Sequence, residues 1–308
     1  MPELPQDVGE YRLLGHIATG GMADVFRGEP VAGGDPVVLK RLLRQHREDA
    51  QFIDRFVGEA KLSVKLRHPN IVRTLKLFKK GPDYFIVQDL VDGPSLAGLL
   101  EARRALGIPL PLSATVHLLS SLLSALDYVH RARLGDTAVT IVHRDVSPAN
   151  LLVDRAGHVK LTDFGVAEAS LHPELKAERG ALAGTPAYMS PEQVMGQPVD
   201  ARSDLFAAGS VLYECLANHP PFESEVEYEL LRQVKEAAPP PLTLEGPEGE
   251  WLAPMVAKAM AKEPQGRFAT AAEQRRALLA AAEKTGVKPS AETLAETVAA
   301  AIEEPQEP

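Results

Sequence analysis

The chain has 308 residues, of which 45% are hydrophobic and 24% are charged, and its formal net charge is −9. This length allows one large hydrophobic core or two moderate ones, and the composition is that of an ordinary globular protein. An acidic chain repels polyanions, so we expect no nucleic-acid partner. The net charge therefore argues against a nucleic-acid-binding protein, although it does not exclude local basic patches.

The cysteine content and the apolar runs bear on the compartment. Cys215 is the single cysteine, so no intrachain disulfide is possible and a reducing compartment is favoured. No apolar stretch approaches the roughly 20 residues that cross a bilayer, so we expect no membrane span in this chain. The first residues lack the basic and apolar regions of a signal peptide. We therefore expect a cytoplasmic protein.

The first third of the chain has the pattern of a strand-rich region. Alternating β-branched and aromatic residues predict strands over residues 11–17, 23–27, 37–42, 71–78 and 84–89. One helix is predicted among them, over residues 51–66, because apolar residues recur at helical spacing and end at His68 and Pro69.

After a turn at Asp92, Gly93 and Pro94, the pattern becomes helical. It predicts helices over residues 95–105, 112–130, 203–217, 251–260 and 269–284, with a loop over residues 239–249. The run 203–217 is apolar nearly all round, which predicts a buried helix at the centre of the second lobe. Beyond Gly286 the chain is rich in Ala, Glu and Pro, so we expect a weakly helical or disordered acidic tail.

These patterns predict an α+β fold with a small β-rich lobe and a larger helical lobe. The expected boundaries are an N-terminal extension at 1–10, the first lobe at 11–91, the second lobe at 92–283 and the tail at 284–308. One short crossing joins the lobes, and a ligand is expected in the cleft between them.

Residues suited to phosphoryl transfer follow one another between positions 143 and 192. In order, they are His143, Arg144, Asp145, Asn150, Asp163, Phe164, Gly165, Pro191 and Glu192. Asp163 and Asn150 offer hard oxygen ligands suited to Mg²⁺, and Asp145 is a carboxylate close to them in sequence. Apolar strands at 141–142 and 151–153 are expected to flank the first polar loop. Any one of these carboxylates alone is more often a helix cap or an ion-pair partner.

This order and spacing resembles the protein kinase family, and in particular the bacterial Ser/Thr kinases of the Hanks type, over roughly residues 11–283. The resemblance implies a bilobal protein kinase fold with ATP bound between the lobes, together with Mg²⁺ or Mn²⁺. It implies an enzyme that phosphorylates Ser and Thr hydroxyls of protein substrates.

The resemblance also assigns the nucleotide site. Residues 17–26 resemble the glycine-rich loop, although an ordinary hairpin turn would have a similar sequence. Lys40 is expected to contact the phosphates and to pair with Glu59, whereas a lone strand lysine is more often solvated. The backbone of Asp89 and Val91 is expected to meet adenine, though a plain buried strand fits the same residues. The implied cofactor-binding residues are Ala18, Gly20, Gly21, Val25, Val38, Lys40, Gln88, Asp89, Val91 and Leu152.

The catalytic roles are carried over in the same way. Asp145 orients the attacking hydroxyl, Asn150 and Asp163 bind the metal, and Thr185 contacts Asp145. The implied catalytic residues are Asp145, Lys40, Glu59, Asn150, Asp163 and Thr185. The resemblance further implies an ion pair between Glu192 and Arg267 and an anchoring role for Asp204 under the catalytic loop.

Three features depart from the family pattern. Ala18 and Ala23 stand where glycines are usual, Val38 replaces the usual Ala, and Ser147 replaces a lysine that contacts the transferred phosphate. The lost positive charge predicts a slow enzyme. The alternative function is a pseudokinase, a nucleotide-binding signalling scaffold without turnover.

Overall fold

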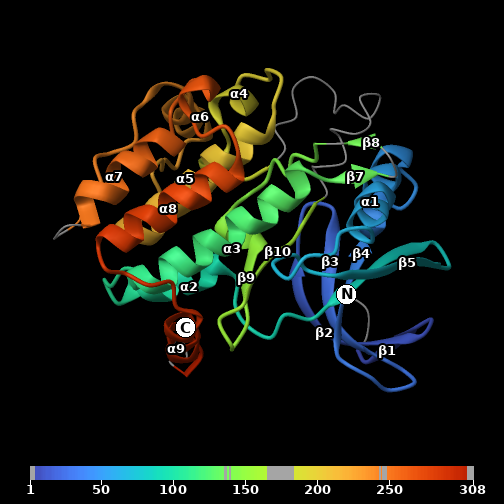
Figure 1. The fold of residues 1–308 in the computed structure, drawn as a ribbon. Helices are drawn as coiled ribbons and strands as arrows, with labels where there is room; N and C mark the ends of the chain where they lie inside the picture. Colours follow the sequence, from blue (N-terminus) through green and yellow to red (C-terminus); the bar gives the residue numbers. More distant parts are fainter. Residues whose placement is uncertain are drawn as a thin grey trace.

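The computed structural model describes residues 4–134, 137–138, 140–164, 184–242, 244 and 248–303. The chain forms a lobe of curled sheet and a lobe of packed helices, which lie side by side in Figure 1. The predicted α+β class and bilobal architecture are confirmed.

The first lobe is built on one antiparallel sheet, whose strand order is β1-β2-β3-β4-β6-β5. Its strands are β1 (Gln6–Val8), β2 (Tyr11–Thr19), β3 (Ala23–Pro30), β4 (Val37–Leu42), β5 (Thr74–Lys80) and β6 (Asp83–Asp89). The expected N-terminal extension thus contributes an edge strand, because β1 pairs with β2. The strand expected over 71–78 begins only at Thr74, and Ile71 instead bridges to Leu161 in the other lobe.

Helix α1 (Ala50–Ser63) packs on this sheet. Asp49 caps its first turn, since the carboxylate accepts hydrogen bonds from the backbone N–H groups of Gln51 and Phe52. Phe56 and Ala60 are buried against Leu42 and Ile86 of the sheet. This packing aligns the helix so that Glu59 faces β4.

The second lobe has a single large core around α3 and α5. Its helices are α2 (Leu96–Ala105), α3 (Leu112–His130), α4 (Pro191–Val194), α5 (Ala201–Ala217), α6 (Glu227–Glu236), α7 (Glu248–Ala259), α8 (Ala271–Lys284) and α9 (Ala291–Glu303). Every residue of α5 from Ser203 to Leu216 is buried, so the predicted central helix is present.

The apolar character of α3 needs one correction to our expectation. By length and composition alone, α3 is able to span a membrane. In the fold, however, its apolar side chains pack against α5, α8 and α9. A core helix of a globular domain passes the same test of length and hydropathy, so this finding is weak evidence for a span.

Short strands flank the lobe junction. β9 (Leu151–Val153) and β10 (Val159–Leu161) form a hairpin, and β7 (Arg133–Leu134) pairs with β8 (Thr137–Ala138) within the stretch before the catalytic loop. The strand expected at 141–142 is absent. Ile141 and Val142 are buried, but the Ile141 N–H bonds to the Val129 carbonyl at the end of α3 instead of joining a sheet.

The expected weakly helical or disordered tail was wrong for residues 291–303, which form α9. The prediction relied on composition, yet Ala and Glu favour helix, and Leu294 and Val298 lie four residues apart on one face. Both side chains are fully buried against the helical lobe.

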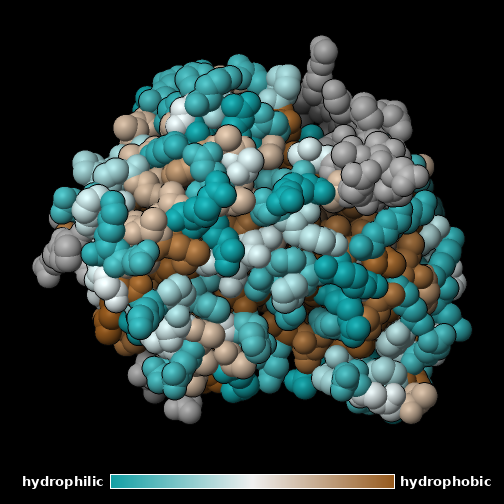
Figure 2. Space-filling model, viewed as in Figure 1, coloured by the Kyte–Doolittle hydropathy of each residue, from teal (hydrophilic) through white to brown (hydrophobic). Residues whose placement is uncertain are grey.

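The surface of the molecule is mostly hydrophilic on the face that Figure 2 shows. Brown apolar side chains appear between the hydrophilic ones in several places. The apolar residues are mostly inside the two lobes, which leaves the site at their junction to be described from its polar groups.

Candidate active site

Lys40 lies at the centre of a charged cluster between the lobes. Its ammonium is 3.6 Å from Glu59 Oε1 and also contacts Asp163 Oδ1. Lys40 and Glu59 are both largely buried, while the Asp163 side chain is 40% exposed. The structure therefore brings together a strand of the first lobe, α1 and the segment after β10, and it contains the predicted Lys40–Glu59 ion pair.

One face of the sheet carries the residues predicted to meet the nucleotide. Val25 is paired directly with Lys40 across β3 and β4, and Val38 is paired with Gln88 across β4 and β6. Directly paired residues share a face of a sheet, so these side chains face the same way. Gln88 is buried and its amide donates to Thr74 Oγ1 at 3.1 Å, which fixes the side chain within the first lobe.

The glycine-rich segment forms the turn between β2 and β3. Gly20 donates its N–H to the Ala23 carbonyl at 2.9 Å, and Ala18 is paired with Val25. A Cβ at Gly21 would have no atom within 4 Å, and one at Gly20 would meet only the Ala23 carbonyl, at 3.7 Å. Packing within the protein therefore does not require these glycines, and close approach of a ligand to the backbone is what they permit.

The crossing between the lobes contains the predicted adenine contacts. Asp89 ends β6 with its carboxylate turned to Arg73, at 2.9 and 3.0 Å, and its N–H donates to the Arg73 carbonyl at 3.0 Å. The carbonyl of Asp89 is therefore the backbone group left for the predicted ligand contact. Val91 is buried two residues later. From the helical lobe, Leu152 is half-buried between the buried Leu151 and Val153, so it faces away from the core.

Asp145 is held by hydrogen bonds from two segments. Its Oδ1 accepts from the N–H and the hydroxyl of Thr185, at 2.8 and 2.9 Å. Its Oδ2 accepts from Asn150 Nδ2 at 2.8 Å. The predicted contact between Thr185 and Asp145 is present. The carboxylate is thereby fixed between the catalytic loop and the segment that follows Gly184.

The polar loop that begins at His143, called the catalytic loop here, is anchored by the carboxylate of Asp204 in α5, as predicted. Its carboxylate accepts from the backbone N–H groups of His143 and Arg144, both at 2.8 Å, and lies 2.7 Å from His130 Nε2. Burial alone would raise the pKa of Asp204, but the hydrogen bonds from His130 and the backbone outweigh it and lower the pKa. Asp204 therefore stays ionised inside the core.

His143 links the loop to the segment that carries Asp163. Its Nδ1 accepts from the Asp145 N–H at 3.3 Å, and its Nε2 lies 3.0 Å from the Thr162 carbonyl. This places the proton on Nε2, and burial lowers the pKa of His143 despite the nearby Asp204 and Asp145. The ring also packs edge-on against Phe164, with centroids 4.7 Å apart.

Two residues of the site have a left-handed backbone. Asp163 has φ +65° and Arg144 has φ +68°. Such conformations cost free energy in residues other than glycine and persist where the surroundings impose them, often at functional sites. Two hydrogen bonds join β10, which precedes Asp163, to the first lobe. The Leu161 N–H donates to the Asn70 carbonyl and the Val72 N–H donates to the Leu161 carbonyl, both at 2.9 Å. Gly165, which follows Asp163 and Phe164 in the sequence pattern noted above, lies outside the described residues.

The donor set suits Mg²⁺. Asn150 Nδ2 is used twice at Asp145, on the carboxylate and on the backbone carbonyl, which leaves Asn150 Oδ1 as the acceptor. Asp163 adds a half-exposed carboxylate. Within the part of the chain that the structure describes, no three His, Cys, Asp or Glu side chains form a metal cluster. A cation here would need further oxygens from a substrate phosphate or water, which is how Mg²⁺ is usually held.

Ser147, the main departure from the family pattern, is fully buried. Within the described residues its hydroxyl has no hydrogen-bond partner. The position therefore offers a neutral hydroxyl and no charge.

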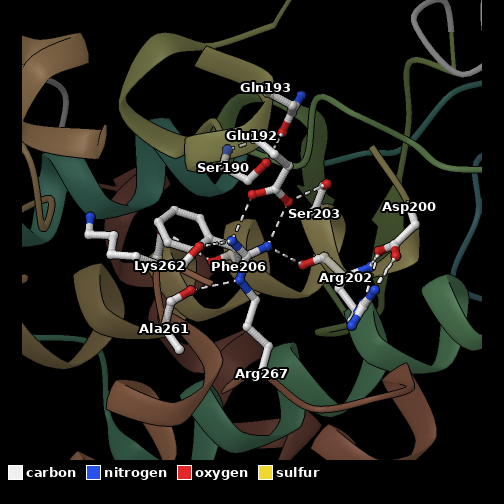
Figure 3. A network of polar contacts seen from close by, with 11 residues as sticks. Ser190, Glu192, Gln193, Asp200, Arg202, Ser203, Phe206, Ala261, Lys262 and Arg267 are labelled. Atoms are coloured by element: carbon white, nitrogen blue, oxygen red, sulfur yellow. Dashed lines mark hydrogen bonds and ion pairs between the residues drawn. The ribbon is translucent and has the colours of Figure 1, made fainter. Parts of the chain in front are cut away.

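The segment after the site is fixed by a buried ion pair, drawn in Figure 3. Both guanidinium NH groups of Arg267 bond the Glu192 carboxylate at 2.7 Å, and Ser203 donates to the same carboxylate at 2.6 Å. Arg267 also donates to the carbonyls of Ala261, Arg202 and Lys262. The ion pair implied by the sequence is present, and it ties α4 to the end of the helical lobe.

Comparison with known proteins decides the family. The model of the protein kinase domain matches residues 11–275. The chain belongs to the protein kinase family.

Individual kinases are similar over most of this chain. A probable serine/threonine-protein kinase of Streptomyces coelicolor is 36% identical over 87% of the chain. The tyrosine-protein kinase MasK of Myxococcus xanthus is 34% identical over 87%, and the serine/threonine-protein kinase PrkC of Bacillus subtilis is 33% identical over 85%. The chain covers 39%, 42% and 39% of the lengths of these three kinases, respectively.

The kinase fold also brings in residues that the sequence analysis missed. Tyr188, three residues after Thr185, donates to Glu214 of α5 at 2.5 Å, and Arg104 of α2 bonds the same carboxylate at 2.8 Å. Burial and the adjacent Glu214 raise the pKa of Tyr188, so its hydroxyl keeps its proton. Glu214 lies among apolar residues of a buried helix, and an acidic residue at such a position was the available signal.

Proposed function

We propose that this chain is a protein serine/threonine kinase of the bacterial type, which transfers the ATP γ-phosphoryl group to Ser and Thr hydroxyls of protein substrates. The observation that carries the proposal is the fixed Asp145 carboxylate. It lies between Asn150 and Thr185, and Thr185 belongs to the segment that docks the substrate in the family. A carboxylate held in this way can orient an incoming hydroxyl and accept its proton.

The remaining roles follow from charge and position. Lys40, held by Glu59, supplies positive charge for the nucleotide phosphates, and the backbone of Gly20 and Gly21 is open to them. Asp163 and Asn150 would hold Mg²⁺, which neutralises phosphate charge when it is bound. In the nucleotide-bound protein Lys40 would turn from Asp163 to the phosphates, which would leave the Asp163 carboxylate free to hold Mg²⁺.

The adenine side of the site is proposed at the lobe crossing. The backbone of Asp89 and Val91 would hydrogen-bond the base, and Leu152 and Val38 would pack on its two faces, because they project from opposite lobes. The half-buried Val38 is larger than the usual Ala and narrows the space for the base. We place the protein in the cytoplasm, consistent with its one buried, unpaired cysteine.

Acceptor specificity is the part of the proposal that a direct experiment tests. Wild-type protein is incubated with labelled ATP, Mg²⁺ and general acceptors such as casein and a Tyr-rich copolymer, and the labelled products are hydrolysed to phosphoamino acids. The proposal predicts phosphoserine and phosphothreonine. Phosphotyrosine alone would assign the specificity that the name of the similar MasK kinase states. Nucleotide binding without any transfer would support the pseudokinase reading, for which the neutral Ser147 is the specific observation.

A further inference from the structure

Helix α9 is seated on the helical lobe by both packing and hydrogen bonds. Leu294 and Val298 are fully buried, and α9 contacts α2 and α3. At its start, the Ser290 N–H donates to the Ser113 carbonyl at 3.1 Å, and the Ser290 hydroxyl accepts from the Thr293 N–H at 3.0 Å. The helix is therefore a fixed part of the domain in this structure.

The first turn of α9 rests directly on the backbone of the β9–β10 turn. A Cβ built on Gly157 would come within 2.1 Å of the Ala291 carbonyl oxygen and 3.2 Å of the Ala295 nitrogen. Gly157 also has φ +79°, so both the contact and the backbone conformation require glycine. On the other side, His117 Nε2 of α3 lies 3.1 Å from the Gly157 carbonyl oxygen. The turn is held between α9 and α3, as its position beside the red helix in Figure 1 shows.

The same turn supports the crossing between the lobes. The Arg155 N–H donates to the Asp92 carbonyl at 3.1 Å, and the Val153 N–H donates to the Pro94 carbonyl at 3.0 Å. A Cβ on Gly93 would lie 2.0 Å from the Val153 carbonyl oxygen. The crossing and the β9–β10 turn are thus in backbone contact, and movement of one requires movement of the other.

We propose that α9 is a positioning element of the nucleotide site, which acts through Gly157 and the β9–β10 turn on the lobe crossing. Asp92 follows Val91 directly, and β9 carries Leu152, so the turn adjoins two of the residues assigned to adenine. Nucleotide affinity then depends on α9 being docked, and by reciprocity nucleotide binding strengthens the docking. This inference rests on the proposed nucleotide site.

The test compares two acidic substitutions in the full chain. Leu294→Asp places a charge on the buried face of α9, and Ala299→Asp places the same charge on its exposed face. Calorimetric titration with ADP and Mg²⁺ should show affinity at least about fivefold weaker for Leu294→Asp, the lower end of the usual coupling between sites. Ala299→Asp should change affinity by less than about twofold.

A positioning role has a kinetic signature that a general loss of structure lacks. For Leu294→Asp the KM for ATP should rise by a larger factor than kcat falls, because docking of α9 acts on binding and not on Asp145. Equal ADP affinity in Leu294→Asp and Ala299→Asp would overturn the inference. Wild-type protein that binds no ADP would overturn the proposed function as well, so the two failures are distinguishable.

A measurement on wild-type protein covers the case in which Leu294→Asp does not fold. Hydrogen exchange of the Ser290 and Arg155 amides reports docking of α9 and closure of the turn, since both amides are hydrogen-bonded in the structure. Addition of ADP and Mg²⁺ should slow exchange at both amides. If the nucleotide binds but the exchange rate of the Ser290 amide does not change, the proposed coupling is contradicted.

Discussion

At the scale of single residues, the geometry of Asp145 decides what the site can do. Its carboxylate accepts three hydrogen bonds, two from Thr185 and one from Asn150. Both oxygens of the carboxylate thus act as acceptors in this arrangement. Thr185 and Asn150 come from different segments. The Asp145 carboxylate is therefore held in this orientation only when both segments are in place.

Replacement of Asp145 tests this role. Asp145→Asn puts an amide NH₂ opposite the donors of Thr185 or Asn150 and removes the group that accepts the proton. Phosphoryl transfer should fall by about 10²- to 10⁴-fold, the usual contribution of general acid–base catalysis. ADP affinity should stay near that of wild type, because Asp145 is assigned no nucleotide contact. Asp54→Asn, an exposed position on α1, is the matched control, and a wild-type rate in Asp145→Asn would refute the assignment.

Arg267 is the residue on which the segment around Glu192 depends for stability. Its side chain is fully buried, and the Glu192 side chain is only 5% exposed. Arg267→Ala leaves that carboxylate buried without its cation, which should lower the free energy of unfolding by about 3–5 kcal/mol. Arg232→Ala removes an exposed pair with Glu229, and its effect on the free energy of unfolding should be much smaller than that of Arg267→Ala. Urea unfolding of both variants gives the comparison, and similar losses would contradict the account.

At the scale of elements, Lys262 joins α6 to the central helix. Its ammonium donates to the Val234 carbonyl of α6 at 2.6 Å and lies 4.4 Å from the ring centroid of Phe222 and 5.6 Å from that of Phe206. Burial, with a smaller effect of the nearby Arg267, lowers the pKa of Lys262 to about 8. The charged form is thus less favourable in the folded chain than in the unfolded chain.

This pKa predicts a rise in stability with pH. In the unfolded chain Lys262 titrates near its ordinary value of 10.5, and in the folded chain near 8. Between these values the unfolded chain binds more protons, so the free energy of unfolding increases as the pH rises. Urea unfolding of wild type and Lys262→Met from pH 7.5 to 9.5 isolates the effect of this residue. The difference between them should shift in favour of wild type with pH, and a constant difference would disprove the assignment.

Several elements were predictable because local pattern and burial agree. The bounds of β4 and α3 match the prediction, since β4 begins with a run of Val and Leu residues and the apolar stripe of α3 is continuous. The short helix α6 was not anticipated, because only Val234 in it is buried. A weakly helical or disordered tail was expected, but docking of α9 on the helical lobe was not, because only Leu294 and Val298 are fully buried apolar residues in an Ala- and Glu-rich stretch. A strand at 141–142 was predicted from apolar character, which does not distinguish strand from buried coil.

For the site, the residues were predictable from the sequence, whereas several contacts that hold the surrounding structure together were not. The identity and order of Lys40, Glu59, Asp145, Asn150 and Asp163 are visible in the sequence, and the fold brings them together. The sequence does not indicate the contact of Gly157 with Ala291 or the hydrogen bond between Tyr188 and Glu214. These contacts join residues far apart in the chain and depend on how the helices pack, which no local pattern encodes.

At the scale of the whole molecule, the residues that we propose for catalysis come from both lobes. The first lobe supplies Lys40 and Glu59, and the helical lobe supplies Asp145, Asn150 and Asp163. Two backbone bonds between Leu161 and residues Asn70 and Val72 join the lobes close to Asp163. The contact of Lys40 with Asp163 shows that the two sets of charges meet in this structure. The residues that we propose for phosphate binding and transfer thus meet at one site.

The most direct measurement is the transfer of labelled γ-phosphate from ATP to casein, for wild type and Asp163→Ala, with and without Mg²⁺, alongside ADP binding without metal. The account predicts transfer by wild type that needs Mg²⁺, and loss of at least about 10²-fold in Asp163→Ala, since a group that stabilises transition-state charge is typically worth that much. ADP binding without metal should be similar in both proteins. Wild-type protein that binds ADP but transfers no phosphate under any metal condition would contradict the account and identify a pseudokinase.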